Sequence, residues 1–169
     1  MPGLSAQVDA RGCFRILGID PGSRATGYGV IEKDGSRLHF ICCGVIKVSD
    51  RLSFPLRLKG IHDGLGEVIA KQGPAVAAVE DVFVASNPRS ALKLGHARGV
   101  AILAAMQQGL DIYDYTPRMI KQAVVGYGNA DKHQIQQMVR VLLKLSSSPS
   151  TDAADALAVA ICHANQLSL

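Results

Sequence analysis

The sequence predicts an α/β fold in which a five-stranded mixed sheet is flanked by helices on both faces. Five short segments are rich in apolar residues and bounded by glycine, proline or Asp-Gly turns, as strands commonly are. Three of these segments come first, and the other two alternate with helical patterns, which is typical of a mixed sheet with helices. The segment at 75–80 is apolar at nearly every position, as expected for a central strand covered on both faces.

The elements of the first half follow from apolar spacing and turn residues. Residues 15–20 form the first predicted strand, which ends at a Pro-Gly turn. Strands at 26–33 and 37–48 are joined by an Asp-Gly hairpin turn, so we expect an antiparallel meander of three strands. Apolar residues at helical spacing predict a helix over 55–72, and a Gly-Pro pair ends it before the strand at 75–80.

The second half is predicted to be mostly helical. Asn87-Pro88 is a strong helix start, because asparagine caps helices and proline suits their first turn, and this helix runs to about Gln108. A fifth strand covers 110–115, and a short helix follows the capping residue Thr116. After a glycine-rich loop at 126–130 come helices over 131–145 and 152–166, separated by the polar stretch 146–151.

Length and composition limit the class of protein. A chain of 169 residues suits one compact domain, and we expect a disordered extension at 1–14 and a single domain at 15–169. No apolar run reaches the roughly 20 residues that span a bilayer, so we expect a cytoplasmic protein without membrane association. The four cysteines have no zinc-site spacing and are expected to be free thiols. The net charge of +4 is compatible with a polyanionic partner, although many soluble proteins carry a similar excess.

Four carboxylates form the candidate site. Asp20 closes the first predicted strand and Glu80 the fourth, so both leave the same sheet edge if these strands are parallel neighbours. Asp152 and Asp155 lie three residues apart in the first turn of the last helix and share one face of it. If that face docks on the sheet edge, all four side chains converge.

Each of these acids also has an ordinary structural interpretation. Asp20 could serve the Pro-Gly turn, and the pair on the last helix could stabilise the helix dipole. Glu80 is harder to explain in this way, because it follows an apolar strand and needs a partner there. Two carboxylates about 4 Å apart repel by about 4 kcal/mol at an effective dielectric constant near 20, so a cluster of four requires protons or cations. Carboxylate oxygens favour Mg²⁺ or Mn²⁺ over zinc, and two such ions suit phosphodiester hydrolysis.

Six segments of the chain, in order and with matching spacing, resemble the RuvC family of bacterial Holliday junction resolvases. They are LGIDPGS (17–23), TGYGVIE (26–32), VEDVF (79–83), SALKLGHARGVA (90–101), IKQAVVGYGNADK (120–132) and DAADALAVA (152–160). The resemblance implies a ribonuclease-H-like nuclease domain over 15–169 and a homodimer that nicks opposing strands of four-way junction DNA symmetrically during recombination and repair. It also implies dependence on Mg²⁺, with Mn²⁺ able to replace it and two ions per active site when DNA is bound, and cooperation with the branch-migration complex RuvA–RuvB.

The resemblance assigns roles residue by residue. The family's four acidic metal-binding and catalytic residues fall on Asp20, Glu80, Asp152 and Asp155. Its two functionally important lysines fall on Lys121 and Lys132, and its junction-associated aromatic residue falls on Phe83. Arg89, Lys93 and Arg98 add positive charge to the long helix, and we expect Arg89 and Lys93 to contact DNA. Helical lysines are more often solvated surface residues, and Phe83 also suits a core position at a strand end.

Some features of the sequence are compatible with different functions. His96 stands where the family leads us to expect glutamine, and the GxxxG pattern of Gly95 and Gly99 is weak support for a dimer contact. The segment 20–30 also resembles the phosphate-binding hairpin of ATP-dependent phosphotransferases of the sugar-kinase and actin type. A non-catalytic junction-binding module and a related RNA nuclease are likewise compatible with the sequence.

Overall fold

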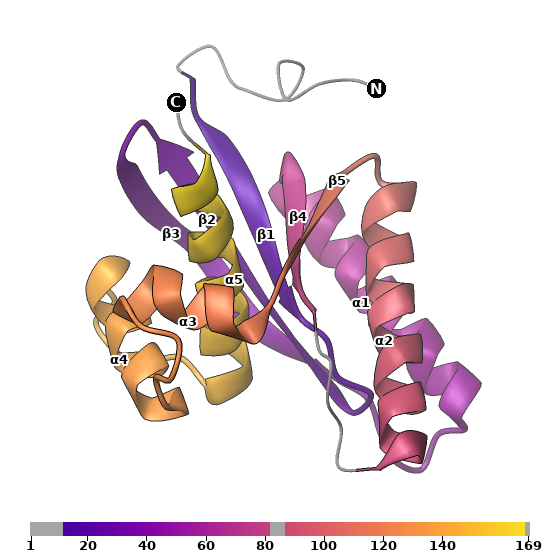
Figure 1. Ribbon diagram of the computed structural model, residues 1–169. Helices are drawn as coiled ribbons and strands as arrows, with labels where there is room; N and C mark the ends of the chain where they lie inside the picture. Colours follow the sequence, from indigo (N-terminus) through magenta and orange to yellow (C-terminus); the bar gives the residue numbers. More distant parts are fainter. Residues whose placement is uncertain (1–11, 82–86, 168–169) are drawn as a thin grey trace.

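One sheet with helices on both sides organises the chain (Figure 1). The computed structural model describes residues 12–81 and 87–167, so most of the expected extension at 1–14 lies outside it. The strands are β1 (Phe14–Asp20), β2 (Ala25–Asp34), β3 (Arg37–Lys47), β4 (Val76–Glu80) and β5 (Asp111–Tyr115). The helices are α1 (Phe54–Gln72), α2 (Pro88–Gln107), α3 (Pro117–Val125), α4 (Lys132–Leu142) and α5 (Thr151–Gln166).

The strand order confirms the predicted mixed sheet. The five strands lie in the order β3-β2-β1-β4-β5, with β1, β2 and β3 forming the expected antiparallel meander. β4 runs parallel to both β1 and β5, and Ile19 of β1 pairs with Val79 of β4. The carboxyl ends of β1, β4 and β5 therefore meet at one edge of the sheet.

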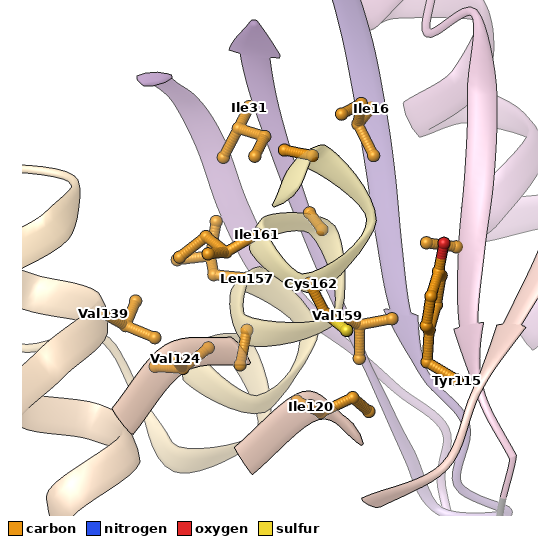
Figure 2. Packing of buried hydrophobic residues seen from close by; sticks show 14 of the residues in the cluster. Ile16, Ile31, Tyr115, Ile120, Val124, Val139, Leu157, Val159, Ile161 and Cys162 are labelled. Atoms are coloured by element: carbon orange, nitrogen blue, oxygen red, sulfur yellow. The ribbon is translucent and has the colours of Figure 1, made fainter. Parts of the chain in front are cut away.

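Alternate residues of the central strands build two separate cores. Ile16 and Val76 face the side covered by α3, α4 and α5, where Figure 2 shows Ile16 and Ile31 above the α5 residues Leu157 and Ile161. Leu17, Ile19, Ala77 and Val79 face the side covered by α1 and α2. β4 is thus buried on both faces, as its apolar run predicts. Within the described residues, no helix has the length and hydropathy needed to cross a membrane.

The helix ends follow the local sequence. Asn87 Oδ1 accepts a hydrogen bond from the Ser90 amide at 2.9 Å, and Asp131 caps α4 in a reciprocal pair with Gln134. α4 ends at Leu142, three residues before the predicted end at 145. The chain turns there because Lys144 adopts a left-handed conformation with φ 53°.

Small residues let α5 approach the sheet very closely. A Cβ atom on Gly18 would lie 2.0 Å from the carbonyl oxygen of Ala156, and one on Gly27 would lie 2.1 Å from that of Asp152. Only glycine permits such contact between a strand and a helix backbone. The first turn of α5 therefore lies against the beginning of β2, next to the end of β1.

Candidate active site

The predicted convergence of Asp20 and Glu80 is confirmed by the strand pairing. The two residues follow the paired positions Ile19 and Val79 at the ends of adjacent parallel strands. Their carboxyl groups are hydrogen-bonded to each other, with Asp20 as the protonated donor. The central strand β1 and its parallel neighbour β4 thus hold the first pair of acids.

α5 brings the second pair of acids to the same place. Asp155 lines a cavity together with Asp20 and Glu80, and its negative charge acts on both of them. Asp152 does not line this cavity, but its charge acts on Asp20 and Asp155. The four acids therefore form one electrostatically coupled group, although Asp152 stands at its margin.

The cavity has a volume of about 270 Å³ and is formed by strand ends and by α3, α4 and α5. Its remaining lining consists of two lysines and an apolar wall: Lys121, Lys132, Pro117, Ile120, Ile135 and Ala158. These apolar residues are not recognisable from the sequence as part of the site. Their helical spacing predicts buried positions, and Ile120 and Ile135 are indeed buried, but periodicity cannot show that they border a polar cavity.

Burial and mutual repulsion keep the carboxyl groups protonated to an unusually high pH. Burial, then the charge of Glu80 and the hydrogen bond to it, raises the pKa of Asp20 to about 9. Burial also raises the pKa of Glu80, while the hydrogen bond from Asp20 opposes that rise. Burial raises the pKa of Asp155, and the neighbouring Lys132 opposes that rise. Asp20 therefore holds a proton at neutral pH when no other cation compensates the charge of the cluster.

Both predicted lysines lie at this cavity. Lys132 Nζ is 3.5 Å from Asp155 Oδ2, and its side chain remains 77% exposed at the first position of α4. Lys121, on α3, lowers the pKa of Glu80 and Asp155 through its charge. The two lysines come from helices on either side of the glycine-rich loop, so one face of the cavity is cationic.

The donor set fits divalent cations of the Mg²⁺ class. Among the residues that the structure describes, no three His, Cys, Asp or Glu side chains are already arranged as metal ligands. Asp20 instead donates a hydrogen bond to Glu80 through its proton. Clustered carboxylate oxygens with raised pKa values are nevertheless the groups that a hard cation would stabilise by replacing that proton.

Arg98 supports the end of β4. Its Nε donates a hydrogen bond to the carbonyl oxygen of Glu80 at 3.3 Å, and its Nη2 forms ion pairs with Asp114 and, at 3.8 Å, with Asp81. A backbone donor of this kind fixes the position from which the Glu80 side chain projects. The sequence alone left the direction of Arg98 undecided.

The other basic candidates lie apart from the cavity. Arg89 and Lys93 are exposed in the first two turns of α2, and Lys93 Nζ lies 5.9 Å from the ring centroid of Phe54. His96 also contacts this ring edge-on, at 5.7 Å between centroids, and has no part in the carboxylate cluster. Phe83 lies outside the described residues.

Comparisons with known proteins show the family to which this chain belongs. The family model described as Crossover junction endodeoxyribonuclease RuvC matches residues 16–163. A crossover junction endodeoxyribonuclease RuvC of Geobacter metallireducens is 57% identical over 152 residues, which cover 90% of this chain and 93% of the relative. The corresponding protein of Cupriavidus metallidurans is 55% identical, with 90% and 84% covered.

A solved structure supports the same relationship in three dimensions. Thermus thermophilus RuvC in complex with Holliday junction substrate superposes with a TM-score of 0.84 at 35% identity, covering 89% of this chain and 93% of that one. The ribonuclease-H-like architecture and the extensive sequence identity therefore indicate the same family. The chain belongs to the RuvC family of crossover junction endodeoxyribonucleases.

Proposed function

We propose that this protein is a structure-selective endonuclease that resolves Holliday junctions by nicking opposing strands, in DNA recombination and repair. The observation that carries the proposal is the group of four coupled carboxylates beside two lysines at one sheet edge of a RuvC-family chain. The Thermus thermophilus relative that is 35% identical was solved with a Holliday junction substrate, which supports the choice of DNA.

Asp20, Glu80, Asp152 and Asp155 would hold Mg²⁺, or Mn²⁺ in its place, with two ions per site when DNA is bound. Such ions, when bound, make water a better nucleophile and stabilise the departing oxygen of a phosphodiester. Asp20 and Glu80 provide fixed ligands because they project from central strands. Asp155 can exchange its ion pair with Lys132 for a new partner, since Lys132 is largely exposed.

The lysines and the apolar wall serve the DNA. Lys121 and Lys132 would contact the phosphate backbone next to the bond that is cut, where their charge offsets that of the phosphate. Ile120 and Ile135 exclude water from one side of the cavity, which strengthens these charge interactions. We also assign Phe83 to an unpaired base near the junction centre, and Arg89 and Lys93 to more distant phosphates.

We further propose that the active form is a homodimer joined through α2. Leu92, Leu103 and Met106 are exposed at helical spacing, and Leu103 and Met106 are 51% and 60% exposed. Gly95 and Gly99 lie on the same face of α2, and these five residues form its exposed stripe. A Cβ atom on either glycine would meet nothing within 4 Å. Within the described residues this small-residue pattern thus packs against no other element. Two-fold symmetry suits two equivalent cuts in a four-way junction.

Further parts of the proposal depend on family membership. We place a single nuclease domain at 15–169 and add Phe14 to it, because β1 begins there and the Phe14 side chain is buried. A protein with this substrate would work in the cytoplasm, together with the branch-migration complex RuvA–RuvB.

Product mapping on a synthetic immobile four-way junction tests the proposed function. With Mg²⁺ we expect paired nicks at symmetry-related positions of opposing strands, and no cleavage after chelation. The matched control is Asp20→Asn, which should bind the junction without cutting it. Junction binding with no cleavage under any divalent ion would indicate a binding module instead. Preferential cleavage of an RNA–DNA hybrid would indicate an RNA nuclease, and tight ATP binding would favour a phosphotransferase.

A further inference from the structure

A second and larger cavity, here named the hairpin groove, has a volume of about 960 Å³. It lies between the β2–β3 hairpin, the segment that follows α4, and the last turn of α5. Its lining residues are Lys33, Ser36, Arg37, Leu38, His39, Phe40, Cys43, Leu142, Leu143, Lys144, Leu145, Ser146, Ser147, Pro149 and Asn165. None of them lines the carboxylate cavity, which lies at the other end of β1 and β2.

The charge of the hairpin groove is entirely positive. Lys33, Arg37 and Lys144 line it together with His39, and no aspartate or glutamate does. Most of the Lys33 side chain is buried against the groove. Its amine forms no ion pair with an acid of the described chain. The groove therefore presents three cations and no carboxylate among its described lining residues.

The backbone gives a second, independent indication at Lys144. This residue has φ 53°, and it is the one described non-glycine residue with positive φ. Glycine adopts this conformation without the strain that a Cβ atom causes. A lysine at this position therefore keeps its side chain at the groove at an energetic cost, which suggests that the side chain has a use there.

Part of the groove lining is apolar. Leu38, Phe40, Leu142, Leu145 and Pro149 contribute to it, and Phe40 and Leu142 are each 38% exposed. Cations beside apolar side chains in a concave surface suit a ligand that has both carboxylates and apolar side chains. A DNA backbone would gain little from contact with these apolar side chains.

We propose that the hairpin groove binds an acidic peptide segment of a partner protein. Its carboxylates would pair with Lys33, Arg37 and Lys144, and at least one large apolar side chain would rest on Leu38 and Phe40. This surface is separate from the carboxylate cavity, so a partner could be held there while DNA is being cut.

Selection from a random peptide display library on the full chain tests the proposal. We expect enrichment of peptides that combine Asp or Glu with a large apolar residue. A fluorescein-labelled copy of the most enriched peptide should bind about tenfold more weakly to the double variant Arg37→Glu/Lys144→Glu. The matched control Arg51→Glu/Lys71→Glu makes the same change in net charge outside the groove and should bind like the wild type.

Lys144→Gly separates binding from folding. It removes the charge at a position where glycine is unstrained, so Tm should stay the same or rise while peptide affinity falls. The proposal is overturned if no acidic and apolar sequences are enriched, or if the groove variants bind the peptide like the wild type. It is also overturned if these variants weaken binding of a short DNA duplex and leave peptide binding unchanged, because the groove would then be a DNA contact.

Discussion

The backbone of Gly27 lies so close to Asp152 that a Cβ atom on Gly27 would come within 2.1 Å of the Asp152 carbonyl oxygen. This contact sets the distance between α5 and the sheet, and thereby the position of Asp155 next to Asp20. We predict that Gly27→Ala displaces the first turn of α5, lowers the free energy of unfolding by at least about 2 kcal/mol and abolishes junction cleavage. Urea unfolding and a single-turnover cleavage assay measure these effects.

Gly66→Ala is the matched control for this variant. Gly66 lies inside α1, and a Cβ atom there would meet nothing within 4 Å. The change should stabilise the protein by about 0.5–1 kcal/mol, because alanine favours helices, and leave cleavage unchanged. Wild-type stability and activity in Gly27→Ala would show that α5 does not depend on this contact.

The protonation of Asp20 predicts a stability that depends on pH. Its pKa is about 9 in the folded protein against an ordinary value of 3.8, so the folded state binds the extra proton between these two values. Stability of the metal-free protein should therefore fall as pH rises from about 4 to 9. Asp20→Asn removes this loss and should raise the free energy of unfolding by on the order of 2 kcal/mol at pH 8, with little change at pH 4.

Urea unfolding in the presence of a chelator, at both pH values, measures this difference. Addition of Mg²⁺ should then raise the Tm of the wild type at pH 8 and leave that of Asp20→Asn almost unchanged, because the ion replaces the proton. An equal effect of the substitution at pH 4 and pH 8 would contradict the predicted protonation.

Lys132 should affect cleavage more than binding. We predict that Lys132→Ala slows single-turnover cleavage by about tenfold to hundredfold, because a positive charge beside the cut phosphate is lost. Lys132 also lowers the pKa of Asp155 and Glu80, so the pH–rate profile should move to higher pH in this variant. Lys132→Arg should recover much of the rate. Weaker junction binding with an unchanged cleavage rate would remove Lys132 from the chemistry.

The exposed stripe of α2 predicts a charge-sensitive dimer. Leu103→Glu should convert the protein to a monomer in sedimentation velocity experiments, because it places a charge in the middle of the proposed interface. Leu56→Glu is the control, since Leu56 is 52% exposed but lies on α1. The monomer should lose the simultaneous cutting of opposing strands. A Leu103→Glu protein that still sediments as a dimer would place the interface elsewhere.

Much of this architecture is encoded locally and could be predicted from the sequence. The Asp-Gly hairpin, the Asn-Pro helix start and the apolar strand at 76–80 each depend on neighbouring residues, and all agree with the structure. The proximity of Asp20 and Glu80 could be predicted because neighbouring parallel strands end at a common edge of the sheet.

Features that depend on long-range packing could not be predicted in this way. The direction of Arg98 is set by Asp114, sixteen residues away, and by the Glu80 carbonyl group. The contact between Gly27 and Asp152 joins residues at opposite ends of the sequence, and no local pattern encodes it. α4 ends earlier than predicted because Lys144 adopts a left-handed conformation. Nothing in the sequence indicates that a lysine would do so at this position.

The acids of the active site project from β1, β4 and α5, whereas its lysines come from the peripheral helices α3 and α4. The acids and the lysines are consequently carried by different elements of the fold. Substitutions in the stretch from 116 to 132 can therefore change how the cut phosphate is held, while the carboxylate cluster on the strands and α5 keeps its geometry.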